Sequence, residues 1–106
     1  MPVRKNPVRK NLSKEDVLLL LEGESYYQDL KHGGAEHDVQ HGEPGFLLFI
    51  EYQLKKAKHA YYYGSSIDFL KAVIIIMTLA YKMLITFNYA PLINPTKWRS
   101  EDMLKL

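Results

Sequence analysis

The segment from residue 69 to 87 constrains the fold more than any other part of this 106-residue chain, because it offers no wide polar face. Its apolar residues fall on nearly every side of a helix: Phe69, Leu70, Val73, Ile74, Ile75, Ile76, Met77, Leu79, Met83, Leu84 and Ile85. A helix of this kind has to be covered all round. The rest of this short chain cannot easily surround the apolar helix. We therefore expect a second copy of the chain to cover its remaining apolar surface. A C-terminal tail wrapped over the helix is the alternative.

The same segment raises the question of a membrane span. Its uninterrupted apolar run covers residues 72–81, about half of the roughly twenty residues that a spanning helix needs. Lys71 and Lys82 flank this run, so we expect a core helix and no membrane partner. The chain has no cysteine, and its basic, proline-rich start does not resemble a signal peptide. These features predict a cytoplasmic protein.

Two further helices are predicted before the apolar segment. Ser13 followed by Asp16 resembles a capping box, so the first helix is expected to begin there and to end at the glycine pair 33–34. The second is expected to run from about residue 44 to Gly64. Its predicted buried stripe recurs at steps of three and four residues: Leu47, Ile50, Leu54, Ala57 and Tyr61.

Composition divides the chain into three parts. Residues 1–12 contain a tandem repeat, PVRKN at 2–6 and 7–11, whose prolines block a helix, and we expect a flexible basic arm. Residues 13–88 form the predicted helical domain. Residues 89–106 hold two prolines and are expected to be an extended C-terminal tail with room for a short helix. The predicted fold is therefore all-α, a small bundle of three or four helices that forms a homo-oligomer.

The distribution of charge argues against nucleic acid as a partner of the helical domain. The net charge is +2, and four of the fourteen basic residues lie within the first ten positions. The body of the protein is therefore close to neutral. Only the arm at residues 1–12 suits a phosphate backbone or an acidic partner, and a solvated tail is the simpler interpretation of it.

Residues 32–45 hold three of the four histidines and are expected to form an ordered loop between helices. If this stretch were helical, His37 and His41 would share a face at the spacing of two-histidine metal sites. With Asp38 as a third ligand, they could hold a divalent metal, the one cofactor that the sequence suggests. The alternative is that these side chains cap helix ends and bond to the backbone.

The run GGAEHDVQH at residues 33–41, followed by a helix at 46–60 and the apolar third helix, resembles a family of small, all-helical, bacteriophage-encoded proteins of unassigned function that share a GGxEHDxxH loop motif. The resemblance covers about residues 26–87 and implies the host cytoplasm as the location. The chain is also distantly similar to MazG-type nucleotide pyrophosphohydrolases, which hydrolyse nucleoside triphosphates with magnesium in oligomeric helical bundles. Their acidic cluster is missing, because only Glu51 and Asp68 stand on the corresponding helices.

Lysines and tyrosines take the place of those acids on the second helix. They can hold a phosphate by charge and stack a base on a ring. The predicted ligand-binding residues are Lys55, Lys56, Lys58 and Tyr62, with His37, Asp38 and His41 shaping the neighbouring loop. We therefore expect a non-catalytic, oligomeric binder of a small phosphorylated or nucleotide ligand. By analogy, such a phage protein would sequester a nucleotide signal of host defence.

Two alternatives belong to other classes of function. A metal-dependent hydrolase acting on nucleotides would use His37, Asp38 and His41 to activate a water molecule, since the chain has no cysteine and no recognisable serine triad. A structural or virion interaction protein would use the lysines as a solvated face and the tyrosines as an oligomer interface. This structural interpretation explains the lysines and tyrosines at least as well as a nucleotide site does.

Overall fold

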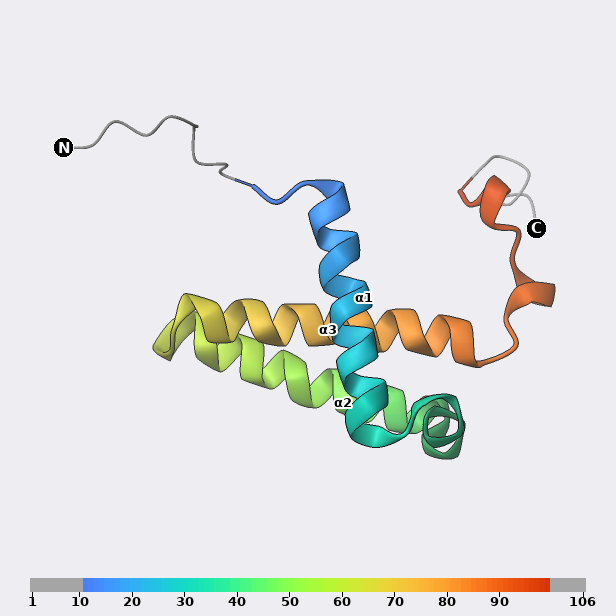
Figure 1. Ribbon diagram of the computed structural model, residues 1–106, viewed down its shortest axis with the longest axis horizontal. Helices are drawn as coiled ribbons and strands as arrows, with labels where there is room; N and C mark the ends of the chain where they lie inside the picture. Colours follow the sequence, from blue (N-terminus) through green and yellow to red (C-terminus); the bar gives the residue numbers. More distant parts are fainter. Residues whose placement is uncertain (1–10, 100–106) are drawn as a thin grey trace.

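The computed structural model describes residues 11–99, so positions 1–10 of the predicted arm and positions 100–106 of the predicted tail lie outside it. The described chain forms three α-helices, α1 (Lys14–His32), α2 (Gly34–Tyr63) and α3 (Ser66–Thr86), and two 3₁₀ turns, η1 (Ala90–Leu92) and η2 (Pro95–Lys97) (Figure 1). Between residues 11 and 99 no β-strand occurs. The predicted all-α fold is confirmed.

The helix boundaries follow from local capping. The side chain of Ser13 accepts a hydrogen bond from the backbone N–H of Asp16 at 3.0 Å, and the carboxylate of Asp16 accepts one from the N–H of Ser13 at 3.0 Å. This is the predicted capping box, with Asp in place of the usual Glu. The first helix ends at Gly33, as predicted.

The prediction of a loop between residues 32 and 45 is wrong, because residues 34–41 are helical. Helix α2 contains a kink at Gly42, whose φ of 66° and ψ of 176° are not helical. Side chains with a Cβ rarely adopt such a positive φ, so glycine permits the chain to change direction there. The histidines therefore lie on a short helical segment ahead of the kink, and α2 consists of two helical pieces.

Helices α2 and α3 form a hairpin, and α1 crosses it and contacts both (Figure 1). Alanines dominate the buried apolar residues of the described chain: Phe46, Ala57, Ala60 and Ala72. Small side chains at these positions let the two helices approach closely. Gly64 allows a tight connection, since a Cβ there would stand 3.0 Å from the Cα of Ala60.

The prediction of which α2 residues are buried is largely wrong for an isolated copy of the chain. Ala57 is its only buried member, whereas Leu47, Leu54 and Tyr61 are exposed. The helix carries two neighbouring apolar stripes, and the stripe with alanines faces α3 because it allows the closer contact. The stripe with the larger side chains faces outward.

Large apolar side chains remain exposed on all three helices. The N-terminal half of α1 projects beyond the hairpin (Figure 1), and its Leu19 is 66% exposed. On α3, Ile85 is 63% exposed, and Ile67, Leu70 and Leu84 are exposed as well. By length and hydropathy alone, α3 would also qualify as a membrane span; core helices of soluble proteins pass this test too but are mostly buried, whereas only 17% of the apolar window of α3 is buried in the single chain.

The described part of the C-terminal tail does not cover these apolar side chains. Leu92 and Trp98, two large apolar side chains of this tail, are themselves exposed. The tail is instead tied to the start of the second piece of α2, because the Tyr89 hydroxyl donates a hydrogen bond to the Glu43 carboxylate. This hydrogen bond raises the pKa of Tyr89 above its ordinary value, since loss of the proton would place two anions side by side.

Candidate functional site

A buried lysine joins the three helices. Lys82 on α3 is only 5% exposed, and its Nζ lies 2.7 Å from Oδ1 of Asp29 on α1 and 3.4 Å from Oδ2 of Asp38 on α2. A buried charge is tolerated when it is paired and hydrogen-bonded. The two carboxylates supply this compensation, and the Asp38 side chain is itself only 13% exposed. Lys82 therefore fixes the helical segment that carries the histidines.

His32, His37 and His41 form a cluster beside this ion pair. His37 Nε2 and His41 Nε2 are 2.7 Å apart, and the rings of His32 and His37 stack with centroids 5.8 Å apart. At hydrogen-bond distance, one Nε2 must donate an N–H and the other must accept it. Gly45 leaves room for this arrangement, because a Cβ there would stand 2.8 Å from the Cβ of His41.

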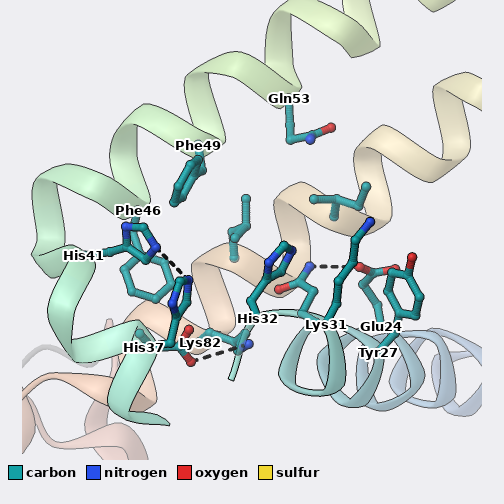
Figure 2. A pocket seen from close by; sticks show the side chains of 14 residues that line it. Glu24, Tyr27, Lys31, His32, His37, His41, Phe46, Phe49, Gln53 and Lys82 are labelled. Atoms are coloured by element: carbon teal, nitrogen blue, oxygen red, sulfur yellow. Dashed lines mark hydrogen bonds and ion pairs between the residues drawn. The ribbon is translucent and has the colours of Figure 1, made fainter. Parts of the chain in front are cut away.

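A cavity of about 490 Å³ opens between the three helices beside this cluster (Figure 2). We call it the histidine cavity. Its wall combines rings, aliphatic side chains and charged groups: Glu24, Tyr27, Gln28, Lys31, His32, His37, Asp38, His41, Phe46, Phe49, Gln53, Ile75, Leu79 and Lys82. Its size and mixed lining are typical of sites for small molecules.

A second cavity, of about 680 Å³, follows the hairpin toward its tip. We call it the lysine cavity, because Lys55, Lys56 and Lys71 line it with Asp68 as the only acid in its wall. Three positive charges against one negative charge give it an affinity for anions. The remaining wall is formed by Tyr52, Gln53, His59, Ala60, Gly64, Ala72 and Ile75.

Gln53 and Ile75 line both cavities, so the two cavities adjoin. Gln53 extends from α2 at the edge of the histidine cavity (Figure 2). Its Oε1 is shielded from water and has no hydrogen-bond partner. A buried acceptor without a partner is costly and therefore unusual. The side-chain amide stands at the junction with an unused hydrogen-bonding capacity.

The structure separates the predicted ligand-binding residues into three groups. His37, Asp38 and His41 line the histidine cavity, whereas Lys55 and Lys56 line the lysine cavity. Neither cavity is lined by the other two predicted residues, Lys58 and Tyr62, which are both exposed.

Most of the residues that line these cavities were not predicted as site residues, and Gln53, Lys71 and Lys82 are among them. A polar side chain within an apolar helix face was the only signal available for Gln53 and Lys82. Spacing alone could not show that either residue borders a cavity.

The three predicted metal ligands do not converge on one point. Asp38 is directed to Lys82, and the two histidine Nε2 atoms are closer together than the roughly 3.3 Å that separates two ligands of a tetrahedral zinc ion. In the described part of the chain, no group of three histidine, aspartate or glutamate side chains is placed to hold a metal. A metal at this cluster would require both histidine rings to turn and would compete with Lys82 for Asp38.

Comparison of the chain with protein-family models, curated proteins and solved structures finds no match. The phage-family resemblance, which rests on the loop motif, and the MazG resemblance, which rests on length and helical order, therefore stay predictions. Any functional assignment has to come from the chemistry of the two cavities.

Proposed function

We propose that the protein binds a small phosphorylated ligand, a nucleotide, across the two adjoining cavities and releases it unchanged. The observation that carries this proposal is the contrast between the two linings. The histidine cavity combines several rings with two lysines and two acids, whereas the lysine cavity has three lysines with one acid. A nucleotide has the same division, with a flat base at one end and phosphate at the other.

The lysine cavity suits the phosphate end. Lys55 lies 3.5 Å from Glu51 in an exposed pair one helical turn apart, an interaction that is weak in water and easily exchanged for a phosphate. Lys56 lies over the ring of Tyr52, with Nζ 5.5 Å from the centroid, which directs its side chain along this face. Lys71 contributes a third positive charge from α3.

The histidine cavity suits the base. Phe49 gives exposed apolar ring surface, and Tyr27 gives a second exposed ring from α1. Stacking of a base on an aromatic side chain contributes about 1–3 kcal/mol and is tolerant of base identity. Two cationic side chains, Lys31 and Lys82, also line this cavity.

The acids of the histidine cavity already have partners, which supports binding without turnover. Asp38 is paired with Lys82, and Glu24 accepts a hydrogen bond of 2.9 Å from Gln28. Nucleotide hydrolysis with magnesium needs carboxylates available to the metal. We therefore propose sequestration, which in a phage-encoded protein would withhold a nucleotide signal of host defence in the host cytoplasm.

Thermal unfolding tests the proposal directly. A ligand at a hundredfold excess over its Kd stabilises the folded state by about 2.7 kcal/mol, which for a chain of this size raises Tm by about 10 °C. We expect such a rise with at least one nucleotide from a broad panel that includes cyclic and linear dinucleotides, while chromatography recovers the ligand intact. If no nucleotide in the panel shifts Tm, the proposal is wrong.

We also propose that the protein is a homo-oligomer. Its radius of gyration is 17.6 Å, against about 13 Å for a compact domain of this length. The large exposed side chains of α1 and α3 are of the kind that an obligate interface buries.

Disruption of the exposed α3 face should therefore lower the mass of the particle. Leu84→Glu with Ile85→Glu would place two charges in the proposed interface, and we expect light scattering to report a smaller species or an unfolded chain. Lys58→Glu, an exposed change on α2, should leave the mass unchanged. A wild-type protein that is monomeric at micromolar concentration would contradict this proposal, whereas an oligomer that binds no nucleotide would favour a structural or virion component.

A metal-dependent hydrolase is the second candidate, favoured by the shared face of His37 and His41. Their Nε2 atoms lie 2.7 Å apart, and both rings would have to turn for the two nitrogens to bind one ion. Elemental analysis after purification without chelator decides between the two functions. Stoichiometric zinc, together with nucleotide hydrolysis that is lost in His37→Ala, would favour the hydrolase.

A further inference from the structure

The tip of the α2–α3 hairpin carries large exposed side chains that line neither cavity. Three of them are the tyrosines that end α2, and Tyr63 among them is 82% exposed. The first turns of α3 add two aliphatic side chains. We call this group the tip surface, and its members are Tyr61, Tyr62, Tyr63, Ile67 and Leu70. The tip projects past the point where α1 crosses the hairpin (Figure 1), so α1 does not cover it.

Lysines surround the tip surface. Residues 55–71 contain four lysines and one acid, Asp68. Lys58 precedes Tyr61 and Tyr62 by one helical turn, so its side chain lies on the same face of α2 as the two rings. Lys58 is exposed and lines neither cavity. Because positive charge exceeds negative charge around these apolar side chains, the tip surface suits an anionic partner.

A second copy of the chain does not match the tip surface. A two-fold contact between two tips would place lysines against lysines, and like charges across an interface are unfavourable. The proposed oligomer interface at Leu84 and Ile85 lies near the other end of α3. Seventeen residues separate Leu84 from Ile67, which is about 25 Å along a helix axis. An oligomer formed through that end leaves the tip surface exposed.

The packing of the rings favours a lipid surface over single-stranded nucleic acid. Tyr61 contacts both Tyr62 and Phe69, with ring centroids 5.1 and 5.4 Å apart. These contacts cover part of the ring surface on which a base would stack. Ile67 and Leu70 add aliphatic surface, which suits acyl chains better than bases. Tyrosine is enriched where a membrane meets water, because its ring is apolar and its hydroxyl is polar.

We propose that the tip surface binds an anionic lipid bilayer from one side. The tyrosine rings would lie at the level of the headgroups, and the surrounding lysines would contact lipid phosphates. The sequence-based expectation of no membrane partner rested on the lack of a long enough apolar run, and a peripheral contact needs no spanning helix. The proposal is separate from nucleotide binding, because the tip surface and Lys58 line neither cavity.

Flotation of the full chain with vesicles tests the proposal. We expect binding to vesicles of equimolar phosphatidylcholine and phosphatidylglycerol and not to vesicles of phosphatidylcholine alone, because lysines gain affinity only near an anionic surface. Absence of binding to the anionic vesicles would overturn the proposal. Equal binding to both kinds of vesicle would also overturn it, since the lysines would then have no role.

The variant Tyr62→Ser with Tyr63→Ser separates the tip surface from charge elsewhere in the chain. It keeps every lysine and arginine, so the attraction of the basic segment 1–12 for the vesicles is unchanged. We expect the Kd for anionic vesicles to rise about tenfold, which corresponds to about 60 Å² of apolar surface withdrawn from the lipid. Tm should stay the same, because both rings are exposed.

Tyr26→Ser, a change of an exposed tyrosine on α1, is the control and should leave the Kd for vesicles unchanged. Unaltered vesicle binding by the double tyrosine variant would contradict the assignment of the tip surface. If the double variant instead loses affinity for a single-stranded RNA and keeps its affinity for vesicles, the partner is nucleic acid and the proposal is wrong.

Discussion

Replacing Lys82 with methionine is expected to lower the free energy of unfolding by about 3 kcal/mol, the largest effect on stability that we predict for a single substitution in this chain. The loss of stability arises because the carboxylates that pair with Lys82 remain in the variant without a cation. Asp38, whose side chain is 13% exposed, loses its cationic partner, whereas Asp29 is 46% exposed and can be hydrated. Chemical denaturation with urea would measure the change.

A second substitution tests whether the unpaired charge is the cause. Asp38→Asn in the Lys82→Met background removes the negative charge, and we expect it to recover part of the lost stability. Lys71→Met changes an exposed lysine on the same helix and should alter stability by less than about 0.5 kcal/mol. If Lys82→Met is as mild as Lys71→Met, Lys82 does not tie the three helices together as described.

Loss of the two α2 lysines should weaken nucleotide binding by about thirtyfold. In Lys55→Ala with Lys56→Ala, each substitution removes a charged contact to phosphate, worth about 1 kcal/mol for an exposed side chain. The loss of affinity should depend on the position of the lysines and not only on their charge. Lys55 and Lys56 line the lysine cavity, whereas Lys58 on the same helix does not.

The matched control for this variant is Lys58→Ala. It removes one positive charge from the same helix but outside the lysine cavity, and it should change the Kd by less than twofold. Affinity of the wild-type protein should also fall as salt is added, since screening weakens exposed phosphate contacts. A similar loss in Lys58→Ala and in the double variant would mean that only the net charge of the helix matters, and it would contradict the assignment of the lysine cavity.

Local patterns predicted the helices well. The Ser13 and Asp16 capping box, the glycine at the end of α1 and the glycine after α2 all lie where the sequence placed them. These features depend on neighbours within a few residues, so the sequence contains the information needed to find them. The face shared by His37 and His41 was also foreseen for a helical segment, although the segment was expected to be a loop.

Features that depend on distant contacts could not be predicted. Lys82 and Asp29 are 53 positions apart, and nothing in the local pattern pairs them. Which of the two apolar stripes on α2 is buried depends on how closely α3 approaches. The local pattern does not show this distance, and we therefore predicted leucines in the core where the structure has alanines. Gln53 became notable only when both cavities and its unpaired Oε1 were seen together.

Native mass spectrometry of the protein incubated with a mixture of nucleotides tests the central claim most directly. It records the number of subunits, the number of ligands bound and the mass of each ligand after release. We predict a defined oligomer that retains one intact nucleotide per subunit, and a much lower occupancy in the variant that lacks Lys55 and Lys56. An oligomer that retains no nucleotide, or one that releases only hydrolysed products, would contradict the proposed function.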